Sequence, residues 1–410
     1  MSLHNTLAGI AIACACTTLV ACKSGYNRIY EDNNPEDEDS PGCNSAPINE
    51  NIADKAQVVF ELIADITCTV ISGYTLSGQS LGNGNEIQET GNAFRSYQSL
   101  VEDLADDYDK RIAVISIDYE KSQQYDLDTL KDANLALEKH SNMGGIVSVT
   151  WTPINPWTAS DGSVENQLAA SDDTDITILY GDETALEGDA LAAFNEFDEQ
   201  LGIVIGALKD LDDKKVPVLF APFPQMNTTE YWYGPTPPSQ DESSDTSANS
   251  VTTESEFKAL WSHVADELAK ENLTHLLWVY APRTGLESER KTATWGYPGA
   301  SDVDIVAGIS YSNEVSILDY ASYTNLDKPL GMTRLAPQAA DGTFTNTNYI
   351  VELQGKYKHI AYWIADHDTQ TNNADTLRSI KNNLSAKELL EDSRTATVET
   401  INEKEWLKEN

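Results

Sequence analysis

The sequence has few basic residues for its size. Its 410 residues include 27 Lys and Arg but 66 Asp and Glu, which gives a formal net charge of −39 at pH 7. Nucleic acids and anionic lipid surfaces are polyanions, so the folded part of so acidic a chain is not expected to bind either of them. The excess of carboxylates favours solubility in salty surroundings but does not identify a ligand.

The apolar run at the amino terminus is too short, and too soon followed by polar residues, to be a good membrane span. It reads LAGIAIACACTTLVAC and ends in Leu19-Val20-Ala21-Cys22, which resembles the bacterial lipoprotein box. We therefore expect residues 1–21 to be a lipoprotein signal peptide and Cys22 to carry the lipid, with an ordinary cleaved signal as the alternative. The segment before the run lacks Lys and Arg, a departure from the usual pattern. Lys23 favours the outer membrane, on its periplasmic or cell-surface face.

Cysteine is also scarce. The chain has 5 cysteines, of which Cys14 and Cys16 leave with the signal and Cys22 takes the lipid. The remaining two, Cys43 and Cys68, could form one disulfide in an oxidising compartment, between the tether and the first strand. Two unpaired thiols are the alternative. We expect no metal and no cofactor.

Four segments follow from composition. After the signal, residues 22–51 are polar, acidic and contain Pro and Gly, so they read as a flexible tether. Residues 52–390 carry the folded domain, and residues 391–410 form a charged tail with a helical pattern near its end. Between them, residues 234–256 are rich in Pro, Ser, Thr and Asp, and indicate a solvated loop or, alternatively, a lid over a ligand.

Eight short β-branched runs alternate with helical patterns in the folded domain. Each run is continuously apolar, as parallel strands buried on both faces are. Eight such strands with helices between them predict a (β/α)8 barrel with enlarged loops. A doubly wound open sheet is the main rival, but no glycine-rich phosphate loop follows the first run. The runs begin at Thr69, Ile112, Gly144, Val216, Thr274, Val303, Pro329 and His359, and the clearest helical patterns lie over 194–208 and 257–268.

Segments at the predicted strand ends resemble glycoside hydrolase family 26, the β-mannanase family, from Thr69 to about Asp368. The matching pieces occur in the family's order and include SGQ (77–79), ISIDY (115–119), GGIVSVTWTPINP (144–156), VPVLFAPFPQMN (216–227), LLWVYAP (276–282), YPGASDVDIVAGIS (297–310) and KPLGMT (328–333). The resemblance implies a retaining endo-β-1,4-mannanase fold, in which two carboxyl groups carry the reaction.

Both catalytic positions of the family pattern differ here. The family's acid/base glutamate lies in an Arg-Pro-x-His-Glu-Met-Asn pattern, and this chain has Gln225 within APFPQMN. The nucleophile lies in a Thr/Ser-Glu-x-Gly pattern, and this chain has Arg334 within TRLA. An amide has no proton to give, and a guanidinium is always protonated. The resemblance therefore implies a glycan-binding lipoprotein that does not cleave, with an active mannanase or related retaining glycosidase as the alternative and a protein-binding scaffold as the second alternative.

The expected partner is a β-mannan or related polysaccharide, bound by a monomeric chain that touches membrane only through its lipid. Aromatic faces stack on sugar rings while a few polar groups fix orientation. The expected substrate-binding residues, which could instead serve packing, are Trp151, Asn155, Asn227, Glu230, Trp232, Tyr233, Tyr311 and Trp363.

Glu230 and Arg334 raise three further hypotheses. Both replace residues of the family's active site, so they could form an ion pair across it, or be solvated separately. A uronate or sulfated sugar could instead meet Arg334. Glu230 could also contribute to a relocated active site. Asp118 and Asp304 occur in the family pattern, and we interpret them as structural.

Overall fold

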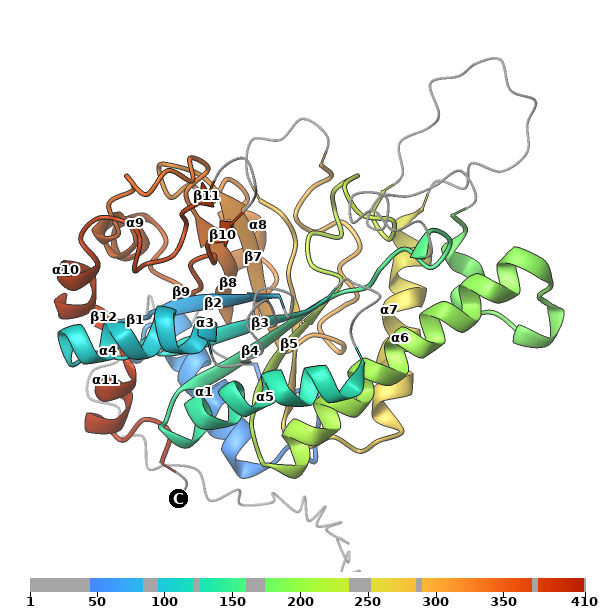
Figure 1. Ribbon diagram of the computed structural model, residues 1–410, viewed down its shortest axis with the longest axis horizontal. Helices are drawn as coiled ribbons and strands as arrows, with labels where there is room; N and C mark the ends of the chain where they lie inside the picture. Colours follow the sequence, from blue (N-terminus) through green and yellow to red (C-terminus); the bar gives the residue numbers. More distant parts are fainter. Residues whose placement is uncertain are drawn as a thin grey trace, which may run out of the picture. The chain divides into compact units, whose positions relative to one another are not determined.

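Parallel strands form one sheet in the computed structural model, which describes residues 45–83, 95–120, 126–159, 174–235, 252–284, 290–370 and 375–408 (Figure 1). The strand order in the sheet is β12-β1-β9-β8-β7-β6-β5-β4-β3-β2. The strands are β1 (Thr75–Leu76), β2 (Gly78–Asn83), β3 (Val114–Glu120), β4 (Ile146–Thr152), β5 (Val218–Pro222), β6 (Leu276–Tyr280), β7 (Ile305–Tyr311), β8 (Leu330–Ala336), β9 (Ile360–Trp363) and β12 (Thr395–Ala396).

The sheet closes on itself through its first strand. β1 and β2 are consecutive pieces separated by Ser77; β1 pairs with β9, and β2 pairs with β3. The closure continues two residues beyond β9, where Ala365 and Gln79 form a parallel bridge. β1 and β2 thus count as one strand of eight around a closed ring, so the predicted (β/α)8 barrel is confirmed and the open sheet is excluded.

Seven of the eight predicted strands are confirmed, and the first is displaced. The run from Thr69 is not a strand: it follows helix α1 (Asp54–Thr67), Thr69 has a left-handed φ of 65°, and Val70 is 54% exposed. The chain needs this turn to reverse direction after α1, and the strand begins only at Thr75. The β-branched residues of this turn therefore led to a prediction that began the first strand too early, at Thr69 instead of Thr75.

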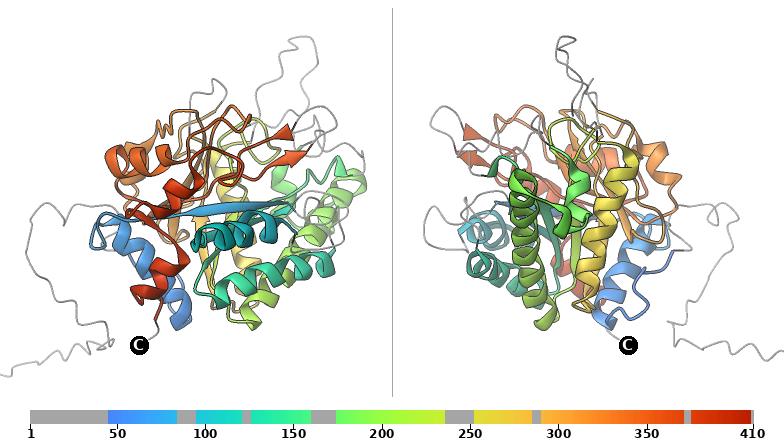
Figure 2. Two further views of the ribbon diagram at one scale, coloured as in Figure 1. Left: turned by 60° about the vertical axis from the view of Figure 1, so that its left-hand side comes forward. Right: turned by 90° about the vertical axis from the view of Figure 1, so that its right-hand side faces the viewer.

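Helices surround the barrel, and the two predicted patterns fall in α6 (Gly188–Asp213) and α7 (Glu254–Ala269), which run side by side on its outside (Figure 2). The chain uses a Thr253–Glu256 capping box to start α7. The other helical segments are α3 (Arg95–Tyr97), η1 (Gln98–Glu102), α4 (Asp103–Tyr108), α5 (Leu127–Asn142), η3 (Ile176–Tyr180), η4 (Glu183–Ala185), α8 (Tyr320–Thr324), α9 (Thr347–Lys356), α10 (Ala386–Glu391) and α11 (Val398–Glu403).

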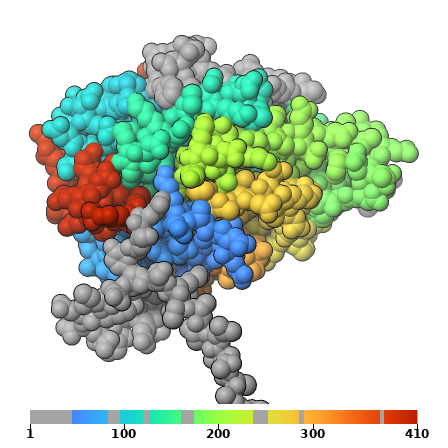
Figure 3. Space-filling view, turned by 90° about the horizontal axis from the view of Figure 1, so that it is seen from below, coloured from blue at the N-terminus to red at the C-terminus, as the bar shows by residue number. Residues whose placement is uncertain are grey.

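The lower half of the barrel interior is apolar and is covered by α1, which lies in the middle of the face seen from below (Figure 3). Val59 and Ile63 of α1 belong to one buried cluster with Leu219, Leu277 and Ile305 from the barrel strands. Toward the carboxyl-terminal ends of the strands, side chains that point into the barrel include polar ones such as Ser116 and Arg334. Apolar packing therefore fills the amino-terminal end of the barrel interior, which leaves the carboxyl-terminal end available for chemistry.

The carboxyl-terminal segment is part of this fold. Residues 391–408, which the sequence separated as a charged tail, contribute β12, which pairs with β1. The backbone N–H of Val398 donates to the carbonyl of Arg111, which fixes the start of α11. α11 accounts for the helical pattern near the end of the chain. A small antiparallel hairpin, β10 (Thr369–Gln370) with β11 (Asp375–Thr376), stands at the opposite end of the barrel.

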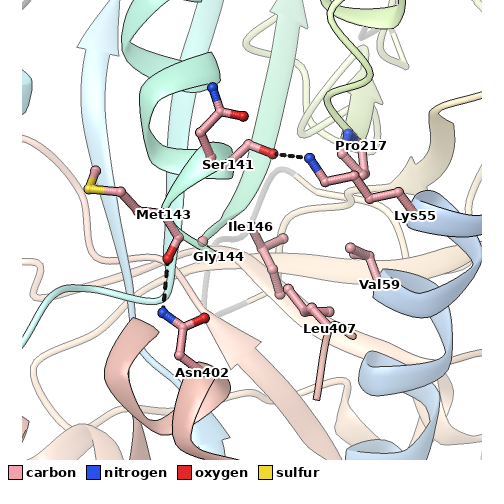
Figure 4. A pocket seen from close by; sticks show the side chains of 11 residues that line it. Lys55, Val59, Ser141, Met143, Gly144, Ile146, Pro217, Asn402 and Leu407 are labelled. Atoms are coloured by element: carbon pink, nitrogen blue, oxygen red, sulfur yellow. Dashed lines mark hydrogen bonds between the residues drawn. The ribbon is translucent and has the colours of Figure 1, made fainter. Parts of the chain in front are cut away.

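A pocket of about 440 Å³ lies at the amino-terminal end, beside α1 (Figure 4). Lys55 Nζ donates to Ser141 Oγ at 3.1 Å, and Asn402 donates to the carbonyl of Met143 at 3.0 Å. The pocket lines the start of β4 at Ile146, so it is remote from the strand ends that carry chemistry in barrels.

Several sequence predictions concern residues outside the described ranges. Cys22, Cys43 and most of the 234–256 loop are among them. Cys68 is buried at the end of α1 and has no disulfide partner among the described residues. None of the helices in the described ranges has the length and hydrophobicity of a membrane span.

Gly331 provides a test of barrel packing. A Cβ at Gly331 would overlap the ring of Tyr362 on the neighbouring strand. We expect Gly331→Ala to lower the free energy of unfolding by about 1–3 kcal/mol, measured by chemical denaturation. Gly202→Ala is the control, because Gly202 is exposed on α6 and a Cβ there meets nothing within 4 Å. An equal loss in both variants would contradict this account of the barrel.

Candidate functional site

Polar side chains from six positions around the barrel meet at its carboxyl-terminal end. Barrel enzymes place their chemistry at this end because loops of free composition follow each strand there. The six are Asp118 on β3, Gln225 after β5, Arg283 after β6, Tyr311 at the end of β7, Arg334 on β8 and Asp366 after β9.

Arg334 is the centre of this group and is only 5% exposed. Its Nη2 lies 2.7 Å from Asp118 Oδ1, and its Nε lies 3.4 Å from Asp366 Oδ1. Its Nη1 donates to Ser116 Oγ at 3.0 Å and to the carbonyl of Thr333 at 2.7 Å. The guanidinium is thus bonded on several sides, and the two charges that oppose it are carboxylates, Asp118 from β3 across the barrel and Asp366 from the segment after neighbouring β9.

A local irregularity in β8 helps to place Arg334. Gly308 of β7 pairs with Met332, whereas the next residue, Ile309, pairs with Arg334. β8 therefore has one more residue than β7 over this stretch. Such a bulge turns side chains out of the simple alternation of a strand, so neighbouring Thr333 and Arg334 can both bond inside the barrel.

The charges around Asp366 keep it ionised. Burial on its own would raise the pKa of Asp366, but His367, Arg334 and Arg378 outweigh burial and hold the pKa well below its usual range. Tyr311 donates its hydroxyl proton to Asp366 Oδ2 at 3.0 Å. Asp366 therefore has no proton to give at neutral pH and serves as an acceptor and counter-ion.

The predicted ion pair between Glu230 and Arg334 is wrong. The ion-pair partners of Arg334 are Asp118 and Asp366, and Glu230 is exposed on the turn after β5. The physical reason is position: Arg334 lies inside the barrel, where it needs buried counter-charges, and Glu230 lies on the rim in water. Asp118, which we interpreted as structural, is thus part of the candidate site.

Gln225 is held in an unusual backbone conformation. Its φ is 61° and that of Phe223 is 53°, both in the left-handed region. Non-glycine residues with such values cluster at functional sites. The Gln225 amide oxygen accepts a hydrogen bond from Arg283 Nη1, and the amide nitrogen donates to Tyr231 Oη at 2.9 Å. The amide is therefore engaged on both ends by protein groups.

Two arginines that the sequence did not indicate stand beside Tyr311. The guanidinium carbons of Arg283 and Arg378 lie 4.8 and 5.3 Å from the centre of the Tyr311 ring, in cation–π geometry. Arg283 follows β6 directly, so the strand-end rule could have found it. Arg378 comes after the β10–β11 hairpin, and no strand-end signal marks it.

Most of the predicted sugar-stacking residues are buried. Trp232 and Trp363 have no exposed surface, and Trp151 is 2% exposed. Trp232 donates to the carbonyl of Pro153 at 2.8 Å, and Tyr233 donates to the carbonyl of Pro224 at 2.8 Å. These side chains build the walls behind the site. Sequence patterns could not distinguish them from surface aromatics because both kinds lie at the ends of strands or just after them.

The two predicted asparagines are buried as well. Asn227 donates to the carbonyl of Arg283 and accepts from the Arg283 backbone N–H, so it fixes the chain after β6. Asn155 accepts the backbone N–H of Trp157 at 2.9 Å. The aromatic side chains with partial exposure at this end are Tyr231, Tyr311 and Trp157.

Two other aspartates, Asp304 and Asp368, have structural contacts. Asp304 lies at the amino-terminal end, accepts the backbone N–H groups of Ile48 and Trp278, and has a pKa raised to about 6 by burial. Asp368 accepts the backbone N–H groups of Arg378 and Ser379 at 2.7 and 2.8 Å. Asp368 therefore positions Arg378. No cluster of metal-binding side chains occurs in the described ranges.

Residues 48–392 match the family model described as glycosyl hydrolase family 26. The chain belongs to glycosyl hydrolase family 26. This assignment agrees with the resemblance seen in the sequence and with the barrel topology.

The family members most similar to this chain include curated and solved proteins. A mannan endo-1,4-beta-mannosidase from Bacillus subtilis is 32% identical over 188 residues, which is 46% of this chain and 47% of that protein. The chain spans about half the length of these curated relatives, of which another is a mannan endo-1,4-beta-mannosidase from Caldalkalibacillus mannanilyticus. A solved Bacillus subtilis mannanase is 25% identical, with a TM-score of 0.68 over 86% of this chain and 95% of that one. A β-mannanase from a symbiotic protist of the termite Reticulitermes speratus is 15% identical, with a TM-score of 0.59 over 87% of this chain and 97% of that one, and shows the same fold.

Removal of the central cation should be costly. We expect Arg334→Met to lower the free energy of unfolding at pH 7 by about 3–5 kcal/mol, because Asp118 and Asp366 then lose their buried counter-charge. Chemical denaturation would measure the loss. Arg394→Met is the control, because Arg394 pairs with Asp392 near the surface and its loss should cost less than about 1 kcal/mol.

The pH dependence separates charge from packing. The pKa of Asp366 is lowered on folding, so its contribution is present above the unfolded pKa of about 3.9 and is lost as pH falls below it. The difference between the wild type and Arg334→Met should therefore be smaller at pH 3 than at pH 7. A difference that is the same at both pH values would mean that Arg334 acts by packing alone.

Proposed function

We propose that this family 26 protein binds a β-mannan-type polysaccharide at the carboxyl-terminal end of its barrel without cleaving it. The observation that carries the proposal is the bonded guanidinium of Arg334 at the position where the family pattern has its nucleophile. Arg334 pairs with Asp118 and Asp366 there, so the cation is a built feature of the site.

Retaining hydrolysis needs one carboxyl group that donates a proton and another that attacks the sugar. Gln225 can do neither, and its amide is bonded to Arg283 and Tyr231. Asp366 stays ionised at neutral pH and is a poor proton donor. Because Asp118 and Asp366 both neutralise Arg334, their use as catalysts would leave a buried cation uncompensated.

Tyr231 is the residue best placed to contact a sugar. Its ring stacks on that of Tyr233 with centres 5.2 Å apart and an angle of 12°, which gives it a fixed orientation. It is partly exposed, and its oxygen already accepts from Gln225. The Tyr231 hydroxyl proton therefore points to another acceptor, which a sugar hydroxyl can supply. Aromatic rings fixed in this way suit pyranose stacking.

An active endo-β-1,4-mannanase is the second candidate. The comparisons favour it over the binding-only function, since the similar curated and solved proteins are named as mannanases. Such an enzyme would have to replace the carboxyl groups that the family pattern places at Gln225 and Arg334. Exposed Glu230 is the nearest new carboxylate at the rim.

One experiment separates the two candidates. We expect the purified chain to be retarded by soluble β-mannan in affinity electrophoresis, and to release no reducing ends from the same mannan during prolonged incubation. Release of reducing ends above the level of a heat-denatured sample would establish the enzyme. Absence of both retardation and release would reject both functions and favour a protein-binding scaffold.

A variant locates the binding. Tyr231→Ala should weaken mannan binding about tenfold, since the stacking of the tyrosine ring on a sugar ring and one hydrogen bond are lost together. Tyr74→Ala is the matched control, because Tyr74 is also partly exposed but precedes β1 at the other end of the barrel. Equal affinity of both variants would place the glycan elsewhere.

The lipid anchor is a separate part of the proposal. The lipoprotein box ending at Cys22 supports attachment to the outer membrane through lipid, with residues 22–51 as the tether. We expect Cys22→Ser to move the full-length protein from the membrane fraction to the soluble fraction of cells. Cys16→Ser, within the signal segment, should leave it in the membrane fraction. Membrane association of Cys22→Ser would contradict the anchor.

A further inference from the structure

The cations at the carboxyl-terminal end differ in how far they are neutralised. Arg334 is buried and shared between Asp118 and Asp366. Arg378 is partly exposed, and among the described residues it forms no ion pair. Its Nε donates to the carbonyl of Pro337 at 3.2 Å, and its Nη groups form no hydrogen bond to the described part of the chain. The charge of Arg378 lowers the pKa of buried Asp366, but no carboxylate of the described residues lies within ion-pair distance of it, in a sequence with 66 acidic and 27 basic residues.

Arg378 is also held in place. Asp368 accepts the backbone N–H of Arg378 at 2.7 Å and that of Ser379 at 2.8 Å, and its other oxygen accepts from Ser379 Oγ. The guanidinium lies over the Tyr311 ring. A fixed backbone, a bonded Nε and a ring contact together restrict the side chain. A restricted guanidinium loses less conformational entropy when it binds a ligand.

Arg283 lies on the same ring. The two guanidinium carbons are no more than about 10 Å apart, which is the sum of their distances to the Tyr311 ring centre. Both side chains are partly exposed. Tyr311 itself donates to Asp366, so this pair of cations is coupled to the central network through one hydroxyl.

The nearest rim carboxylate acts on the other side of the site. Burial and then Glu230 raise the pKa of Tyr231, whereas burial and then Asp366 raise the pKa of Tyr311. Glu230 precedes Tyr231 in the chain, whereas the guanidinium groups of Arg283 and Arg378 lie over the Tyr311 ring. The hydroxyls of a neutral mannan can accept single hydrogen bonds from a guanidinium group, but a carboxylate also brings the opposite charge and can accept two parallel hydrogen bonds.

We infer that the glycan bound at this end carries carboxylates, as a β-1,4-linked mannuronate does, and that Arg378 binds one of them. The inference rests on the proposed binding function and specifies its ligand. Mannuronate has the ring of mannose with a carboxylate at C6, so the backbone geometry of a mannan is kept. Tyr231 would contact the sugar ring, and the Tyr311 side would receive the acid group.

A matched pair of ligands tests the inference. The probes are a β-1,4-oligomannuronate and the product of its carboxyl reduction, which is a β-1,4-manno-oligosaccharide of the same length. Binding to the whole mature chain is measured by calorimetry at about 0.15 M salt, where the Debye length of about 8 Å screens the net charge of the protein beyond the site. We expect the oligomannuronate to bind at least about tenfold more tightly than its reduced partner, as one charge-assisted hydrogen-bonded pair would give.

Variants assign the preference to Arg378. Arg378→Gln should remove the preference for oligomannuronate and leave the affinity for the neutral oligosaccharide unchanged. Arg378→Lys should keep part of the preference, since the charge remains but the two-pronged geometry is lost. Arg394→Gln is the control for a surface arginine at the other end of the barrel and should change neither affinity.

The outcomes are distinct. Equal or tighter binding of the neutral oligosaccharide would overturn the inference and keep the proposed function. A preference that survives Arg378→Gln would also overturn it. Binding of neither member of the pair would remove the proposed function with it.

Discussion

A guanidinium buried between two carboxylates governs the carboxyl-terminal end of this barrel. Arg334 forms ion pairs with Asp118 of β3 and with Asp366 of the segment after β9. The charges at three positions around the barrel therefore compensate one another. A buried charge without partners costs several kcal/mol, which makes each member of the network dependent on the others. The dependence extends outward. Asp366 accepts from Tyr311, Tyr311 lies under Arg283, and Arg283 holds Gln225, which in turn bonds Tyr231.

The fold accommodates this charge network because the two ends of the barrel interior are filled by different kinds of side chain. Apolar side chains fill the amino-terminal half of the interior, and α1 covers them. The polar half therefore does not have to supply the stability of the barrel, and its side chains can change while the strands stay in place. Family membership consequently determines the barrel scaffold more firmly than it determines the reaction. The match over residues 48–392 describes the scaffold, and the charge network at Arg334 describes the chemistry of the site.

The sequence predicted the barrel well because buried parallel strands leave a strong signal. Seven strands were placed by continuous apolar runs, and the error at Thr69 arose where β-branched residues lie in an exposed turn after an unpredicted helix. The site was predicted less well. The family's catalytic patterns identified Gln225 and Arg334, but position at a strand end could not tell that Trp151, Trp232 and Trp363 face the protein rather than solvent. The partners of Arg334 depend on side chains that are more than 200 residues apart in one case, and charge alone suggested Glu230 instead of Asp118. Such choices are made by burial in three dimensions, which a strand pattern does not encode.

The charges of this network constrain replacement of its single members. A glutamate at position 334 would stand beside Asp118 and Asp366 without the cation that now lies between them, and mutual repulsion would favour protonation of carboxyl groups there. A glutamate at position 225 would meet the Arg283 guanidinium that now bonds Gln225, and an adjacent cation lowers the pKa of a carboxyl group and weakens it as a proton donor. Either single replacement would therefore give a carboxyl group whose pKa does not suit its role, which is nucleophile at position 334 and proton donor at position 225. The two positions belong to one set of charges with Arg283 and Asp366, and the chemistry of this end of the barrel has to be understood from that set.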